Sequence, residues 1–179
     1  MTNYYYLVPS LPSIKSGSDS YMSVETFLSM CRGKITKKDY ATLEKVALSD
    51  EVVESNSFVK AYTRFRSCVE KELAYQRSLA LGIDSDEYRN DGPKDNYISS
   101  VVRKAVNELS PLEGEKLILS LYFSFLDRNV KTGHNYDVTF LISYVLKLQL
   151  LSRRSSFETQ KGKAEFSRLF NTLKKEIFQ

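Results

Sequence analysis

Apolar residues recur every three or four positions along most of this chain, which is the spacing of one face of an α-helix. The longest such segment spans residues 57–81 and ends at Gly82, a residue that commonly stops a helix. Its predicted inward stripe consists of Phe58, Tyr62, Phe65, Val69, Leu73, Gln76 and Ala80. The same spacing predicts shorter helices over residues 23–32 and 36–47, with Ser23 and Thr36 as their N-caps.

The second half of the chain continues the helical pattern. Residues 96–109 form a predicted helix with Ile98 and Leu109 inward, and Ser110-Pro111-Leu112-Glu113 is a capping-box sequence that begins another, extending to about residue 129. Residues 137–151 are apolar on nearly every side, which is typical of a helix at the centre of a bundle. Residues 153–156 then link this segment to a final amphipathic helix.

These elements predict an all-α protein that forms a single multi-helix bundle of about seven or eight helices. The 179 residues contain only 7 Gly and 4 Pro, which favours long helices over a many-turned β-fold. We expect one domain over residues 1–179. It comprises an N-terminal helical half (1–81), an acidic loop (82–95) and a C-terminal helical half (96–179), and the two halves share a core.

The net charge of the chain is concentrated at its C-terminal end. Residues 153–179 contain seven basic and three acidic side chains, whereas the other residues contain equal numbers of each. On a helical wheel an apolar stripe (Phe166, Leu169, Phe170, Leu173 and Ile177) lies opposite a basic face (Lys161, Arg168 and Lys175). This segregation predicts docking onto an acidic partner. The alternative is a last helix that packs through its stripe and leaves the basic face in water.

Two groups of residues are therefore candidates for partner contact. The cationic group comprises Arg153, Arg154, Lys161, Arg168 and Lys175. The aromatic group is Tyr4, Tyr5 and Tyr6, because tyrosine is enriched at interface hot spots. The alternatives are solvated charges for the first group and an aromatic cluster that closes the end of the bundle for the second.

No arrangement of residues predicts catalysis, a cofactor or a metal ion. The chain has one histidine, His134, and lacks the glycine-rich motifs that hold phosphates. Cys31 and Cys68 lack metal-ligand spacing and are expected to be reduced residues of the core. The acidic residues that follow Asp84 do not fit a calcium loop, because Tyr88 and Arg89 occupy its fifth and sixth positions. An enzyme that uses carboxylates and tyrosines without a motif remains a third hypothesis.

Membranes and nucleic acids are the other classes of partner to consider. No secretory signal and no apolar segment long enough to span a bilayer is present, so we expect a cytoplasmic protein without direct membrane insertion. A helical module that binds nucleic acid through the basic C-terminal helix is the less favoured alternative. Its aromatic residues lie on the apolar face, apart from the basic face, so the interleaved pattern used for base stacking is missing.

Four sequence elements, in order, carry a resemblance to a family of short bacterial helical proteins. They are the opening from Tyr4 to Pro12 (YYYLV-x-SLP), the FL-x-x-C helix from Phe27 to Cys31, the PLE-x-E segment from Pro111 to Glu115, and the Y-x-L-K-L-Q-x-x-x-R helix from Tyr144 to Arg153. Together the four elements span nearly the whole chain.

The genes of that family typically lie among those for subunits of bacterial A/V-type ATPases. Its architecture resembles a shortened stalk subunit of the C/d type, the helical adaptor between the rotor shaft and the membrane ring. The resemblance implies a non-catalytic subunit or assembly factor that contacts ATPase subunits and lies peripheral to the inner membrane through that complex. This chain is considerably shorter than the stalk subunit, and Gln149 stands in the neighbourhood where the larger family has a carboxylate.

Overall fold

The computed structural model describes residues 4–18, 21–48, 56–83, 87–88, 95–130, 136–155 and 159–177. Within these ranges all regular secondary structure is helical, which confirms the predicted all-α class. In chain order the elements are η1 (Val8–Ser10), α1 (Val24–Cys31), α2 (Lys37–Leu48), α3 (Ser57–Leu81), α4 (Asn96–Val106), α5 (Pro111–Val130), α6 (Val138–Ser155) and α7 (Thr159–Ile177). No helix in these ranges has the length and apolar character needed to cross a membrane.

Side-chain caps fix several of the helix ends. The Ser23 hydroxyl accepts a hydrogen bond from the backbone N–H of Thr26, which confirms the predicted N-cap of α1. The Thr36 hydroxyl does the same for the Asp39 N–H at the start of α2. Helix α3 has the predicted boundaries and ends at Gly82, whose φ of 67° is in the left-handed region that glycine adopts without strain.

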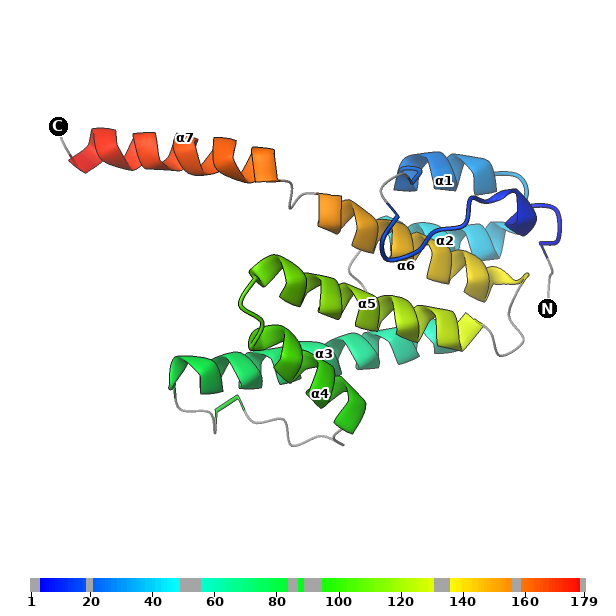
Figure 1. The fold of residues 1–179 in the computed structure, drawn as a ribbon. Helices are drawn as coiled ribbons and strands as arrows, with labels where there is room; N and C mark the ends of the chain where they lie inside the picture. Colours follow the sequence, from blue (N-terminus) through cyan, green and yellow to red (C-terminus); the bar gives the residue numbers. More distant parts are fainter. Residues whose placement is uncertain are drawn as a thin grey trace.

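Helix α6 lies at the centre of the bundle (Figure 1). Helices α1 and α2 cover one side of it and α5 covers another, while α3 and α4 pack together beyond α5. Nine residues of α6 are buried, which explains why the segment is apolar on nearly all sides and confirms its predicted position. Asp137 caps its N-terminus by accepting the N–H of Thr139 at 2.8 Å.

The interior consists of two clusters of buried side chains. The larger contains residues of η1, α1, α2, α5, α6 and the start of α3, and in it the rings of Phe27 and Tyr144 lie 5.0 Å apart. The smaller lies between α3, α4 and α5 around Val69, Val102 and Leu121. Because α3 and α5 contribute to both clusters, they join the two sides of the bundle.

Two predicted boundaries were wrong. Helix α4 ends at Val106, and Leu109, which was expected to point inward, is 99% exposed. The chain must reverse direction before α5 begins at Pro111, and a residue that precedes proline is disfavoured in helical geometry. Helix α6 continues to Ser155, so Arg153 and Arg154 belong to this helix and not to a linker.

Candidate docking surfaces

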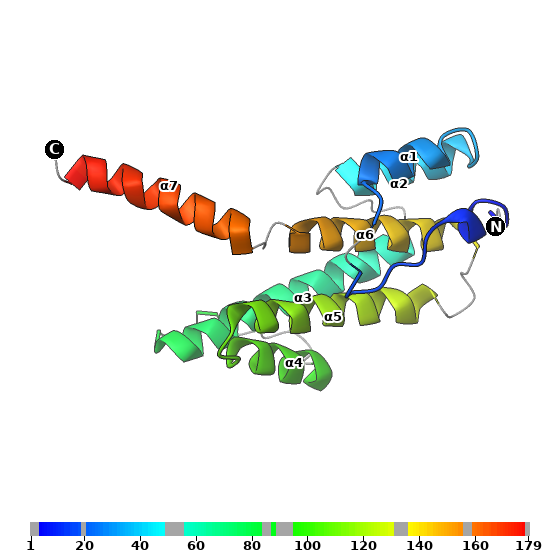
Figure 2. The ribbon, with the colours of Figure 1, turned by 45° about the horizontal axis from the view of Figure 1, so that its top comes forward.

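Helix α7 extends away from the bundle, and no other described helix lies beside it in either view (Figures 1 and 2). Its side chains are described for residues 162–172 and 174, and all of these are exposed. The apolar stripe of α7, here Phe166, Leu169 and Phe170, is 69%, 50% and 56% exposed. The stripe is therefore not packed against the bundle. This differs from the alternative given above, in which the last helix packs through its stripe.

The charges of α7 differ in part from the predicted basic face. The guanidinium of Arg168 donates to both carboxylate oxygens of Glu165, at 2.9 and 2.5 Å, and these hydrogen bonds lower the pKa of Glu165. Lys163 and Lys174 are exposed and stand one helical turn from Phe166 and Phe170, at the edge of the stripe. The side chains of Lys161 and Lys175 lie outside the described residues.

Arg153 and Arg154 are held against the bundle at the end of α6. One guanidinium nitrogen of Arg153 lies 2.9 Å from a carboxylate oxygen of Glu115 on α5. Arg154 donates to the backbone carbonyl of Ser16 at 2.6 Å and so ties the N-terminal segment to α6. These two cations are therefore separated from those of α7 and take part in a different surface.

That surface is a groove between α3, α5 and α6, with a volume of about 320 Å³. It is lined by one face of each helix, with apolar side chains and two ion pairs, Arg66–Glu70 at 2.8 Å and Arg153–Glu115. The complete lining is Tyr62, Arg66, Glu70, Glu115, Ile118, Leu119, Tyr122, Leu146, Gln149, Leu150, Arg153 and Arg154. Gln149 also donates to the backbone carbonyl of Ala47 at 3.0 Å.

Two tyrosines, Tyr62 and Tyr122, line the groove. Burial raises the pKa of Tyr62 to about 12 and raises that of Tyr122 as well, so both phenols stay protonated at neutral pH. The two rings meet edge to face with centroids 6.2 Å apart. Neither hydroxyl has a hydrogen-bond partner among the described residues, so both are available as donors to a bound group.

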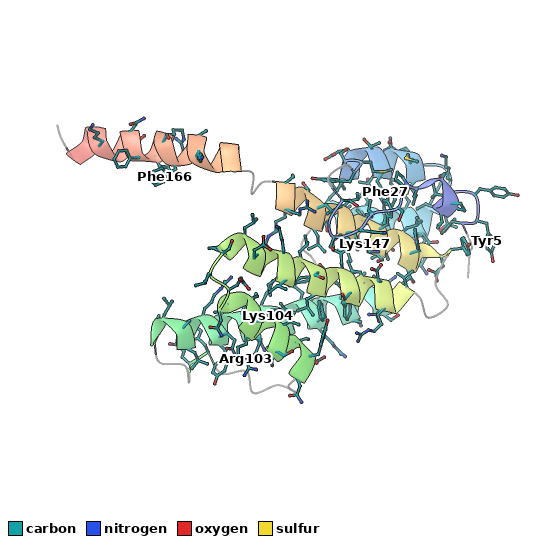
Figure 3. The ribbon with its side chains drawn as sticks, in the orientation of Figure 1. Tyr5, Phe27, Arg103, Lys104, Lys147 and Phe166 are labelled. Carbon is teal, nitrogen blue, oxygen red and sulfur yellow. The ribbon has the colours of Figure 1, made fainter. Side chains whose placement is uncertain are left out.

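The predicted aromatic opening separates into one core residue and two surface residues. Tyr4 is buried, and its hydroxyl donates to the carboxylate of Asp39. The ring of Tyr5 packs on Tyr136 with centroids 4.7 Å apart, and Tyr6 is almost fully exposed. Figure 3 shows Tyr5 at the end of the bundle opposite Phe166 on α7. Tyr5 and Tyr6 are thus both exposed, whereas Tyr4 belongs to the core.

The described residues contain no group of three or more histidine, cysteine, aspartate or glutamate side chains that could hold a metal ion. Cys31 and Cys68 are free thiols, and only Cys31 is fully buried. His134 and the acidic residues Asp84, Asp86 and Asp91 lie outside the described residues.

The groove was not predicted from the sequence, because its acidic residues belong to different helices. Glu70 and Glu115 are 45 positions apart in the sequence, and the packing of α3 against α5 and α6 brings them to one site. The available signal was the i, i+4, i+8 spacing of Tyr62, Arg66 and Glu70, which places an aromatic and an ion pair on one face of α3.

Comparison with known proteins gives one match. Residues 90–177, just under half of the chain, match a protein family described as Protein of unknown function (DUF2764). The matching part contains α4, α5, α6 and α7, and so includes two walls of the groove and all of α7. No curated protein and no solved structure matches the chain.

Proposed function

We propose that this protein is a non-catalytic docking subunit or assembly factor of a bacterial A/V-type ATPase, similar to the stalk subunit of the C/d type, and that α7 contacts its protein partner. The association with the ATPase rests on the sequence resemblance. The observation that carries the docking role is the exposed stripe of α7, which combines two phenylalanines and a leucine with adjacent lysines. Exposed apolar patches of this kind mark interaction sites.

A docking role is also supported by the state of the groove. Its two carboxylates, Glu70 and Glu115, are each paired with an arginine, so both are already engaged in ion pairs. Its two phenols are held in the protonated form by burial. These groups suit recognition better than proton transfer.

The direct test is affinity purification of the tagged chain from its native cells at moderate salt, with identification of the co-purifying proteins. We expect ATPase catalytic and shaft subunits with the unaltered chain, and their loss with the double variant Phe166→Ser and Phe170→Ser. The matched control is Leu81→Ser with Leu109→Ser, which changes two exposed apolar residues elsewhere and should retain the partners.

Charge is tested separately with Lys163→Glu and Lys174→Glu, which should weaken recovery because these lysines border the stripe. If the double variant Phe166→Ser and Phe170→Ser recovers the same proteins as the control Leu81→Ser and Leu109→Ser, α7 is not the contact. If the unaltered chain recovers ribosomal or nucleoid material that nuclease removes, and binding falls steeply with salt, the protein binds nucleic acid instead.

A further inference from the structure

The two edges of the α7 stripe carry different charges. At about 3.6 residues per turn, Lys163 and Lys174 fall on one line along the helix, which we call the lysine edge. Glu165 and Arg168 lie on the other side of the stripe, beyond Leu169. The described lysines therefore border the stripe on one side only.

The cations of the lysine edge are available to a partner. Both side chains are exposed, and neither has an ion-pair or hydrogen-bond partner among the residues that the structure describes. On the other side, the Arg168 guanidinium donates to both carboxylate oxygens of Glu165 and lowers the pKa of that carboxyl group. That ion pair satisfies its own charges, so the unpaired charge described beside the stripe is positive and lies on the lysine edge.

We propose that the partner covers the stripe with an apolar groove that has carboxylates along one wall, the wall that meets the lysine edge. The inference rests on the proposed function, because it specifies the partner surface that α7 contacts. Lys163 and Lys174 are eleven residues apart, which is roughly 16 Å along the helix axis. The acidic wall therefore carries carboxylates about three helical turns apart, and the other wall needs no charge.

The apolar part of this contact has the spacing of a helix that docks in a groove. Phe166, Leu169 and Phe170 stand at positions i, i+3 and i+4, and all three are exposed. Buried aromatic anchors contribute most to such contacts, whereas exposed ion pairs add little affinity and mainly select the partner and its orientation. Because reversing α7 in the groove would move the lysines to the uncharged wall, the lysine edge fixes the direction in which the helix docks.

A second copy of α7 does not supply the acidic wall. In an antiparallel pair of helices equal edges face each other, so the lysines of one copy would lie against those of the other. Like charges placed together at an interface are unfavourable. In a parallel pair the lysine edge would face Glu165 and Arg168, whose charges are already paired. Neither orientation provides a counter-charge.

An anionic bilayer is also a poorer match than a protein wall. A helix that lies in a bilayer interface turns its cationic polar face towards the anionic headgroups. On α7 the carboxylate of Glu165 stands beside Leu169 and would enter the headgroup layer together with the lysines. A protein wall meets one edge alone, which is the arrangement that the charges of α7 fit.

The first test uses the full chain, purified with its partner from native cells, and a carbodiimide, which joins a lysine amine to a carboxylate and takes up the water released. Lys163 and Lys174 should form amide bonds with aspartate or glutamate residues of the partner, identified by mass spectrometry. The control is Lys104, an exposed lysine of α4 away from Phe166 (Figure 3), which should form none. Absence of links from the lysine edge, or links only to a second copy of the chain, would contradict the proposal.

Recovery of the partner by affinity purification then separates charge from packing. Lys163→Gln with Lys174→Gln keeps the apolar stripe and should weaken binding roughly twofold to thirtyfold, as expected for the loss of two exposed ion pairs. Arg103→Gln with Lys104→Gln removes the same charge from α4 and should bind the partner unchanged.

The other edge tests whether the charge contact is one-sided. Glu165→Gln with Arg168→Gln removes the ion pair beyond Leu169 without a change in net charge, and recovery of the partner should stay the same. A loss as large as that of the lysine variant would overturn the proposal, because both walls of the groove would then recognise charge.

Failure of this inference and failure of the proposed function give different results. If Phe166→Ser with Phe170→Ser loses the partner and the lysine variant keeps it at every salt concentration, α7 is the contact and the acidic wall is wrong. If the phenylalanine variant keeps the partner, the docking role of α7 is wrong and this inference fails with it. Binding to phosphatidylglycerol vesicles that is lost in the lysine variant would assign the lysine edge to lipid and overturn the protein wall.

Discussion

Helices α6 and α7 follow one another with three residues between them, yet their surroundings are opposite. Helix α6 buries nine residues and is covered on separate sides by α1, α2 and α5. Every described side chain of α7 is exposed, including an apolar stripe that contains two phenylalanines. The same chain therefore contains one helix whose apolar residues are buried against other helices and one whose described apolar residues are exposed to solvent.

The difference shows what an apolar pattern determines. A helix that is apolar all round requires neighbours on every side, and the chain supplies them for α6. A single stripe requires one neighbour, and the neighbour can belong to another molecule. The faces of α6 are covered by other helices of the bundle, whereas no described helix lies beside the stripe of α7, so we propose that an external partner covers this stripe.

The largest expected contrast is between matched leucine substitutions in the two helices. Leu148→Ala in α6 removes a fully buried side chain and should lower the free energy of unfolding by about 2–5 kcal/mol. Leu169→Ala in α7 should change it by less than about 0.5 kcal/mol, because the side chain is exposed. Denaturant unfolding measures both, and equal losses would show that α7 packs on the bundle in solution.

A second contrast uses glycine. A Cβ atom at Gly114 in α5 would lie 2.5 Å from the carbonyl oxygen of Ala105 in α4, so Gly114→Ala should destabilise the protein by about 1–3 kcal/mol. A Cβ atom at Gly162 in α7 would meet nothing within 4 Å, so Gly162→Ala should raise helicity without loss of stability. Circular dichroism with thermal unfolding checks the pair. A stable Gly114→Ala variant would contradict the close α4–α5 contact.

The smallest effect is a pH dependence confined to the bundle. Burial raises the pKa of the Cys31 thiol from 9.0 to about 11. The folded protein keeps this proton to higher pH than the unfolded chain does. The stability that the protonated thiol of Cys31 contributes is therefore fully present below pH 9 and is lost as the pH rises towards 11. We expect the free energy of unfolding to fall by an amount on the order of 1–2 kcal/mol over this pH range, measured by urea unfolding under reducing conditions. The decline should be shallower in Cys31→Ala, and an identical slope would exclude this thiol as its source.

Much of the bundle was predictable because local signals and tertiary packing agree. Caps at Ser23 and Thr36, the stop at Gly82 and the uniform apolar character of α6 all identify the helices that form. The end of α4 was mispredicted because the apolar periodicity continues to Leu109 although the chain must turn before Pro111. Periodicity reports which residues can share a face and does not report where a chain reverses.

The two docking surfaces were predictable to different degrees. The stripe of α7 follows directly from the sequence, whereas its exposure does not, since exposure depends on which faces the rest of the bundle leaves uncovered. The groove depends on three helices meeting, so the roles of Glu70 and Glu115 emerge only from their packing. The sequence pattern placed Arg168 on a basic face. Its pairing with Glu165 depends on the side-chain rotamers, which residue spacing does not determine.

The central claim is that the stripe of α7 is open to solvent until a partner covers it. Hydrogen exchange of the purified full chain, followed by mass spectrometry of its peptides, tests this most directly. An amphipathic helix of 19 residues without tertiary support is marginal in water, so the amides of α7 should exchange far faster than those of α6, which should open only on global unfolding. Exchange of α7 as slow as that of α6 would contradict the account, because it would mean that the stripe is already packed within the protein.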